Sequence, residues 1–147
     1  MSLKTIAIMS PGSMGSAVGK AIKSYGFSVI TSLDGRSERT KQMAQTSGIE
    51  DVGNLSNLVK HSDLILSILV PSQAHQLAER IAEVIKNTNS KVIFADCNAI
   101  SPASTKQISN TIISSGGDFI DSGIIGGPPN EKDSPRFYVS GPNATQM

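Results

Sequence analysis

The sequence has little of several features that mark specialised protein classes. Its 147 residues include one cysteine and no tryptophan, and only 4% of them are aromatic. A single cysteine excludes a disulfide framework and a cysteine-based zinc site. Thirteen lysines and arginines balance 12 aspartates and glutamates, so the net charge is +1. This balance lacks the basic excess that is typical of a nucleic-acid-binding domain.

Long apolar runs are missing as well. The longest, residues 64–70, is far shorter than the roughly 20 residues that a membrane-spanning helix needs. Ser10, Pro11 and Gly12 interrupt the apolar start of the chain, which excludes a secretory signal peptide. We therefore expect one cytoplasmic domain over residues 1–147, with no nucleic-acid partner and no membrane segment.

What the sequence does contain is an alternation of strand and helix patterns. Apolar or β-rich runs predict strands at residues 5–9, 27–33, 49–52, 64–70, 92–95, 119–125 and 136–140. Helical patterns fill the intervals, at residues 14–22, 36–47, 55–60, 74–85 and 102–115. This order predicts an α/β fold, a doubly wound and mostly parallel Rossmann sheet that ends in a short hairpin strand. Ligands of such sheets bind at the carboxyl ends of the strands.

Capping residues mark the starts of three of these helices. Asn54 and Ser72 precede the helices that begin near residues 55 and 74, and their side-chain oxygens suit an N-cap. Ser101 precedes Pro102, and proline suits the first helical position because the N–H that it lacks would be unpaired there.

A glycine-rich turn lies between the first strand and the first helix. Ser10-Pro11-Gly12-Ser13-Met14-Gly15 stands where a dinucleotide-binding fingerprint is expected, with Ser10 in place of the usual first glycine. Gly12 lets the backbone approach a pyrophosphate, and Gly15 lets the helix pack closely on the sheet. The amide and hydroxyl of Ser13 can bind phosphate at the helix N-terminus, or the hydroxyl can cap the helix. An ordinary tight turn is the alternative.

The residues after the second strand bear on which dinucleotide is bound. NAD sites usually have an acidic residue at the end of this strand, but here the strand ends at Leu33. Arg36 and Ser37 follow, with Arg39 nearby, and can hold a 2′-phosphate through charge-assisted hydrogen bonds. We therefore favour NADP. Asp34 keeps NAD as the alternative, since it can bind a ribose hydroxyl, and it can equally cap the next helix.

Five segments of the sequence form a recognisable pattern through their order and their spacing along the chain. They are Gly12-Ser13-Met14-Gly15, residues 33–37, Ser67-Ile68-Leu69-Val70-Pro71, residues 96–102, and residues 121–127 followed by 137–141. Together they resemble the β-hydroxyacid dehydrogenases, the family that includes 6-phosphogluconate dehydrogenase. The resemblance spans essentially the whole chain and implies an NADP-binding Rossmann domain.

The resemblance also implies roles for particular residues. It implies cofactor contacts at Met14, Leu69, Val70 and Pro71. On the substrate side it implies contacts at Asn98, Gly126 and Gly127.

Departures from the family pattern limit the functional prediction. Ile125 stands where the family usually has a serine that binds a substrate carboxylate, and Asn98-Ala99 replaces a Ser-Thr pair. The family's catalytic lysine lies on a helix beyond this region, so we assign no catalytic residue and expect the C-terminal helical domain to be absent. His61, His75 and Cys97 have no partners at metal or triad spacing, and we interpret them as surface and packing residues.

The sequence thus predicts the NADP(H)-binding domain of a β-hydroxyacid dehydrogenase-like oxidoreductase. The complete enzyme would transfer hydride between the nicotinamide and a hydroxyl-bearing carbon of an unidentified small molecule. A non-catalytic NADP(H)-binding module or sensor, or a truncated gene product, is the alternative. The resemblance further implies a homodimer.

Overall fold

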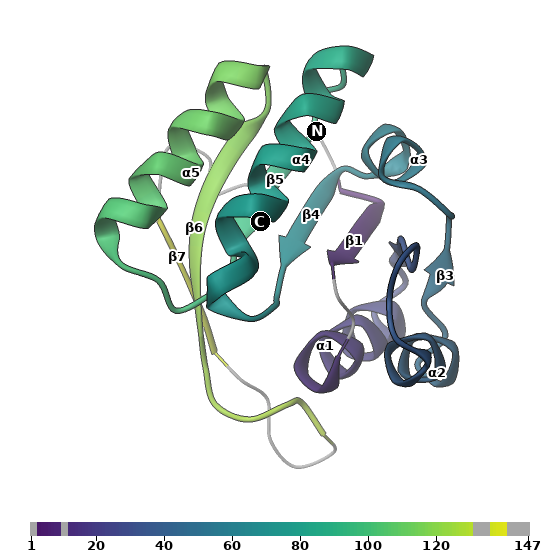
Figure 1. Cartoon of the computed structure of the whole chain (residues 1–147). Helices are drawn as coiled ribbons and strands as arrows, with labels where there is room; N and C mark the ends of the chain where they lie inside the picture. Colours follow the sequence, from purple (N-terminus) through teal and green to yellow (C-terminus); the bar gives the residue numbers. More distant parts are fainter. Residues whose placement is uncertain (1–2, 10–11, 131–135, 141–147) are drawn as a thin grey trace.

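A seven-stranded sheet lies between two layers of helices (Figure 1). The computed structural model describes residues 3–9, 12–130 and 136–140. The strand order is β3-β2-β1-β4-β5-β6-β7. The strands are β1 (Thr5–Met9), β2 (Ser28–Thr31), β3 (Glu50–Asp51), β4 (Leu64–Ser67), β5 (Ile93–Asp96), β6 (Asp118–Ile125) and β7 (Arg136–Ser140). All neighbouring strands are parallel except β7, which runs antiparallel to β6. The predicted α/β fold and hairpin strand are confirmed.

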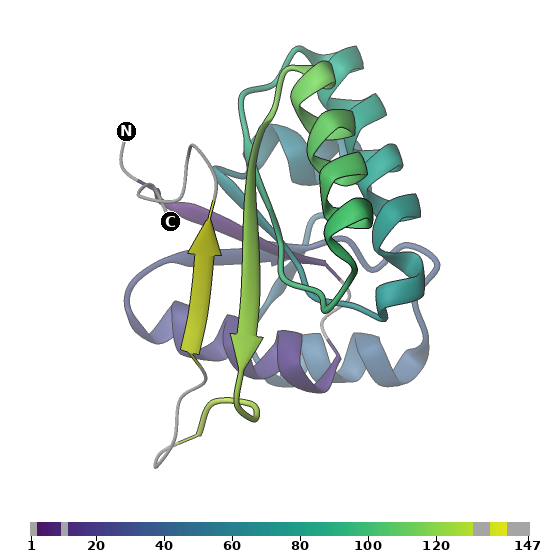
Figure 2. The ribbon, with the colours of Figure 1, turned by 90° about the vertical axis from the view of Figure 1, so that its left-hand side faces the viewer.

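Helices cover both faces of the sheet, as parallel strands with crossover connections require. The helices are α1 (Ser13–Ser24), α2 (Glu38–Thr46), α3 (Leu55–His61), the 3-10 helix η1 (Pro71–Gln73), α4 (Ala74–Thr88) and α5 (Pro102–Ser115). Helices α1 and α2 lie on one face, and α3, α4 and α5 lie on the other (Figures 1 and 2). The hairpin of β6 and β7 forms one edge of the sheet. No helix in the described ranges is long and apolar enough to cross a membrane.

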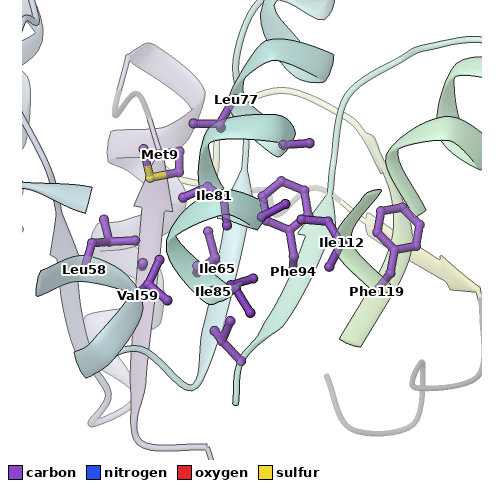
Figure 3. Packing of buried hydrophobic residues seen from close by; sticks show 14 of the residues in the cluster. Met9, Leu58, Val59, Ile65, Leu77, Ile81, Ile85, Phe94, Ile112 and Phe119 are labelled. Carbon is purple, nitrogen blue, oxygen red and sulfur yellow. The ribbon is translucent and has the colours of Figure 1, made fainter. Parts of the chain in front are cut away.

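The larger core cluster fills the space between the sheet and α3, α4 and α5. Leu77, Ile81 and Ile85 recur on one side of α4 and point toward Ile65 and Phe94 of the sheet (Figure 3). A second cluster on the opposite face contains residues of α1 and α2. Burial on both faces explains why the central strands read as nearly continuous apolar runs.

Helix α1 lies unusually close to the segment that leads into β3. Gly15 and Gly19, one turn apart on α1, are both buried. A Cβ atom on Gly19 would lie 2.6 Å from Cδ1 of Ile49, which is closer than two carbon atoms can approach. The absence of a side chain at Gly19 therefore lets the Ile49 side chain pack directly against α1 in its present rotamer.

Strand β4 is shorter than the sequence predicts. It ends at Ser67 rather than Val70. The backbone N–H of Leu69 donates to Oδ1 of Asn98, at 2.8 Å, and so is not available to the strand ladder. The carboxyl end of β4 thus turns into a loop.

Two predicted helix starts also need correction. Ser72 does not cap α4, because Pro71 begins a 3-10 turn in which Gln73 N–H donates to the Val70 carbonyl, and Gln73 becomes the N-cap. Helix α2 begins at Glu38, with Ser37 rather than Asp34 as its cap. The predicted caps Asn54 and Ser101 are confirmed, since each side chain accepts a bond from the N–H three residues later.

Candidate functional site

A pocket of about 420 Å³ lies at the carboxyl ends of β1, β2 and β4. Its walls come from the loop after β2, the start of α3 and one side of α4. The lining residues are Met9, Ser32, Asp34, Arg36, Asn54, Leu55, Leu69, Gln73, Gln76, Leu77 and Arg80. Met9, Leu55 and Leu77 supply apolar surface, and the rest are mostly polar. This mixture suits a ligand with a flat apolar body and polar edges.

A turn after β2 brings Arg36 into this pocket. The Arg36 N–H donates to the Leu33 carbonyl at 2.9 Å, and Gly35 adopts a φ of 75°, which favours glycine. The Nε atom of Arg36 is buried and has no hydrogen-bond partner in the structure. A guanidinium in this state can accept an anion without giving up an existing contact.

A second pocket of about 270 Å³ adjoins the first, because Arg36, Leu69 and Gln73 line both. The other lining residues are Gly12, Ser13, Met14, Gly15, Thr40, Ile68 and Val70. Gly12 is the N-cap of α1 and has no side chain that could cap the helix. The amides of a first helical turn and the positive end of the helix dipole favour phosphate at this place.

The sequence-predicted cofactor residues are largely brought together here. Among those within the described residues, Gly12, Ser13, Met14, Gly15, Arg36, Leu69 and Val70 line one or both pockets. Ser37 and Pro71 do not. The Ser37 hydroxyl accepts from Thr40 N–H as the cap of α2, and Pro71 is the first residue of η1. Ser10 lies outside the described residues.

The predicted substrate residues lie apart from these two pockets. Asn98 lines a larger pocket of about 660 Å³ between α5, β6 and β7. Its amide group is engaged within the chain, with Leu69 N–H at 2.8 Å and the Ser67 hydroxyl at 3.1 Å. Gly126 and Gly127 follow β6 and are exposed, and Gly126 has a φ of 119°. The exposed Ile125 precedes them and offers no hydrogen-bonding group.

Two buried titratable groups lie at the end of β5. Burial raises the pKa of Asp96, the hydrogen bond from Asn98 N–H opposes that rise, and the carboxylate of Asp121 adds to it. Burial also raises the pKa of the Cys97 thiol to about 12. A thiol with so high a pKa is not a nucleophile at neutral pH, which agrees with our interpretation of Cys97 as a packing residue. The described residues contain no group of three metal-binding side chains.

Sequence reasoning missed one side of the first pocket. Gln73, the N-cap of α4, and Gln76 and Arg80 on α4 recur every three to four residues on the side that lines the pocket. In sequence they look like the solvent face of an amphipathic helix, because polar residues at this spacing usually are. The position of α4 in the sequence could have indicated this role. The helix follows a strand of a doubly wound sheet, and ligands bind at the carboxyl ends of such strands.

Comparisons with known proteins identify the family of the chain. A family model described as the NAD binding domain of 6-phosphogluconate dehydrogenase matches residues 5–146. An uncharacterized 28.5 kDa protein from Methanothermus fervidus is 31% identical over 119 residues, which are 81% of this chain and 43% of that protein. The mitochondrial 3-hydroxyisobutyrate dehydrogenase of Drosophila melanogaster is 33% identical over 90 residues, 60% of this chain and 28% of the enzyme.

Solved structures share the fold. A conserved protein of unknown function, described as structurally similar to 3-hydroxyacid dehydrogenases, has a TM-score of 0.83 and 25% identity, with 97% of this chain and 52% of that chain covered. An imine reductase from Myxococcus stipitatus in complex with NADP+ has a TM-score of 0.70 and 21% identity, with coverage of 84% and 42%. A variant of it in complex with NAD+ has a TM-score of 0.68 and 21% identity, with coverage of 87% and 42%.

The chain spans about half the length, or less, of the proteins it matches. The family model, in contrast, covers nearly the whole chain. The match confirms the predicted resemblance. The chain therefore belongs to the family of the NAD binding domain of 6-phosphogluconate dehydrogenase, a family of nicotinamide dinucleotide-binding domains.

Proposed function

We propose that this chain binds NADP(H) in preference to NAD(H), as the cofactor-binding part of an oxidoreductase. The nicotinamide supplies hydride transfer when the dinucleotide is bound, and the protein supplies binding and orientation. The single observation that carries the preference is the Arg36 guanidinium. It lines both pockets, and its buried Nε has no partner. Only NADP(H) carries a 2′-phosphate that can supply this partner.

In this proposal, each of the two adjoining pockets binds a different part of the dinucleotide. The first-turn amides of α1, next to Gly12 and Gly15, take the pyrophosphate, as helix N-termini commonly do. The larger pocket takes the adenine and its ribose. The side-chain amides of Gln73, the N-cap of α4, and of Gln76 on α4 line this pocket and can form hydrogen bonds with the polar edges of the base. Arg36 lies at the junction and faces the ribose phosphate.

A fluorescence titration with NADPH and NADH tests the proposal. We expect NADPH to bind more tightly to the wild-type chain. Charge-assisted hydrogen bonds contribute about 1.5–3 kcal/mol, so Arg36→Ala lowers the affinity for NADPH by about 10- to 150-fold. The affinity for NADH stays nearly unchanged, because NADH has no 2′-phosphate.

Arg39→Ala is the matched control. Arg39 lies three residues further on, is exposed and lines neither pocket, so both affinities are expected to stay within about twofold of wild type. Equal wild-type affinities for the two dinucleotides, or tighter binding of NADH, would contradict the assignment. That result would transfer the ribose contact to Asp34, which lines the first pocket and is the acidic residue that NAD sites use.

We propose further that the reaction is the reversible oxidation of a hydroxyl-bearing carbon, with Gly126 and Gly127 on the substrate side. The described lysines do not line either dinucleotide pocket, and Lys106, which lines the pocket of Asn98, lies outside the five segments that carry the family resemblance. The 147-residue chain alone is therefore expected to bind NADPH and to leave a panel of hydroxyacids unreacted, as a non-catalytic binding module would. Turnover that co-purifies with the chain would contradict this expectation.

A further inference from the structure

The side chain of Asn98 links two loops that are distant in sequence. Its Oδ1 accepts from Leu69 N–H at 2.8 Å, and its Nδ2 donates to the Ser67 hydroxyl at 3.1 Å. These partners lie 29 and 31 residues earlier in the chain. One amide group thus connects the loop after β5 with the loop after β4.

The Asn98 end of this link is itself held in place. The Asn98 N–H donates to Oδ1 of Asp96 at 2.9 Å, and the Cys97 N–H donates to the Ser67 carbonyl at 3.0 Å. Asp96 and Ser67 are fully buried. Because its backbone is fixed to β5, the Asn98 side chain can determine where the β4 loop lies.

The loop it holds is the one that the two proposed dinucleotide pockets share. Leu69 lines both pockets, and Val70 lines the second. The hydrogen bond to Leu69 N–H falls where β4 leaves the sheet, two residues after its last strand residue. Loss of this bond removes the hydrogen bond that holds the backbone of the loop at Leu69.

We propose that Asn98 is a positioning residue, which fixes the Leu69–Val70 loop against the dinucleotide, rather than a contact of the substrate. The inference rests on the proposed function for its effect on binding. Both amide atoms already have partners at β4 and its loop, so these two bonds set the orientation of the amide group. The proposal therefore assigns Asn98 to cofactor affinity.

The first test measures the free chain, before any ligand is added. Asn98→Ala removes the acceptor of Leu69 N–H, so hydrogen exchange at that amide is expected to accelerate about tenfold or more. Exchange at core amides such as Ile65 stays unchanged, which separates a local release from general destabilisation. Asn110→Ala, an exposed asparagine on α5, is the matched control and leaves Leu69 unchanged.

The second test measures dinucleotide affinity. Asn98→Ala is expected to weaken NADPH and NADH by the same factor, about 3- to 10-fold, because the loop lines pockets that both dinucleotides use. This differs from Arg36→Ala, which affects NADPH alone. Ser67→Ala removes the partner of Asn98 Nδ2 and leaves Oδ1 available to Leu69 N–H. We expect this variant to weaken both dinucleotides by a smaller factor. It replaces Asn98→Ala in the test if that variant does not fold.

Unchanged exchange at Leu69 in both variants would overturn the positioning role. So would accelerated exchange with unchanged affinities, or a loss confined to NADPH. A wild-type chain that binds neither dinucleotide would overturn the proposed function instead, and the exchange rate at Leu69 would still show whether Asn98 holds the loop.

Discussion

The carboxyl edge of the sheet has two halves with different character. The loops after β1, β2 and β4 line two adjoining pockets, which contain the guanidinium of Arg36, with its unpartnered Nε, and the first turn of α1. The loop after β5 contains Asn98, whose side-chain amide forms hydrogen bonds with Leu69 and Ser67. The loop after β6 contains two exposed glycines. The first half contains the two pockets in which we propose that a dinucleotide binds. The second half contains a more voluminous pocket of about 660 Å³, which Asn98, Asp121 and Tyr138 help to line.

This difference indicates that the two halves place different demands on their residues. In our proposal, a dinucleotide is bound by backbone amides and one cation. A tight turn and the start of a helix are enough to place these groups. Substrate recognition needs polar side chains aimed at a shared space, and Ile125, Gly126 and Gly127 at the end of β6 supply none. The dinucleotide half can therefore be tested on this chain alone, which the following experiments do.

The largest expected effect concerns the core that supports the first half. Ile65 on β4 is completely buried beneath α4, and Ile65→Ala is expected to lower the free energy of unfolding by about 2–5 kcal/mol. Tyr138→Ala on β7, where the side chain is 54% exposed, is expected to cost about 0.5 kcal/mol or less. Denaturant unfolding checks both values. Similar losses for the two variants would mean that the hairpin contributes as much stability as the central strands.

The second effect compares two glycines, one in each half. Gly15 is buried in the first turn of α1, so Gly15→Val displaces the amides beside it. Overpacking costs about 1–3 kcal/mol, and we expect dinucleotide affinity to fall by about 10- to 100-fold. A Cβ on Gly127 would meet no atom within 4 Å, so Gly127→Val should leave affinity unchanged. Fluorescence titration with NADPH measures both, and circular dichroism verifies that each variant is folded.

The third effect compares two capping serines. Ser37 caps α2 and Ser101 caps α5, each through a bond from the N–H three residues later. Either serine-to-alanine change is expected to cost about 1 kcal/mol of stability. Only Ser37→Ala should also weaken NADPH relative to NADH, because Ser37 adjoins Arg36. An unchanged NADPH preference in Ser37→Ala would confine Ser37 to its capping role.

The smallest effect is a change in how stability depends on pH. Burial and the Asp121 carboxylate raise the pKa of Asp96, so the native state holds this proton more tightly than the unfolded chain does. Its contribution to stability is complete below the ordinary pKa of an aspartate and is lost as pH rises through the raised native value. Asp96→Asn, which keeps an acceptor for Asn98 N–H, should remove this decline. Thermal midpoints between pH 3 and pH 8 give the comparison, with Asp121→Asn expected to shift the decline to lower pH.

Most of the fold could be predicted because it depends on local patterns. Continuous apolar strands, the α4 stripe that includes Ile81 and the caps Asn54 and Ser101 are visible in a few neighbouring residues. The end of β4 could not be predicted, because it depends on a hydrogen bond from Leu69 N–H to the side chain of Asn98, which lies 29 residues away. An apolar run carries no sign of such a partner.

The candidate site divides in the same way. Gly12, Gly15 and Arg36 were predicted because the turn chemistry and charge that they carry are readable in sequence. Gln76 and Arg80 were not, because a polar helix face gives no sign of whether it meets water or a pocket. For Asn98 the resemblance implied a substrate contact, and the two hydrogen bonds to Ser67 and Leu69, which no sequence pattern shows, carry the positioning role that we propose instead.

The close approach of α1 to the sheet has a consequence for sequence divergence. Because a methyl group at residue 19 would collide with Cδ1 of Ile49, the sizes of these two residues are coupled. A relative with alanine at the first position should carry valine or a smaller residue at the second. The pair would then change together over evolutionary time, although 30 residues separate them and neither lines the dinucleotide pockets.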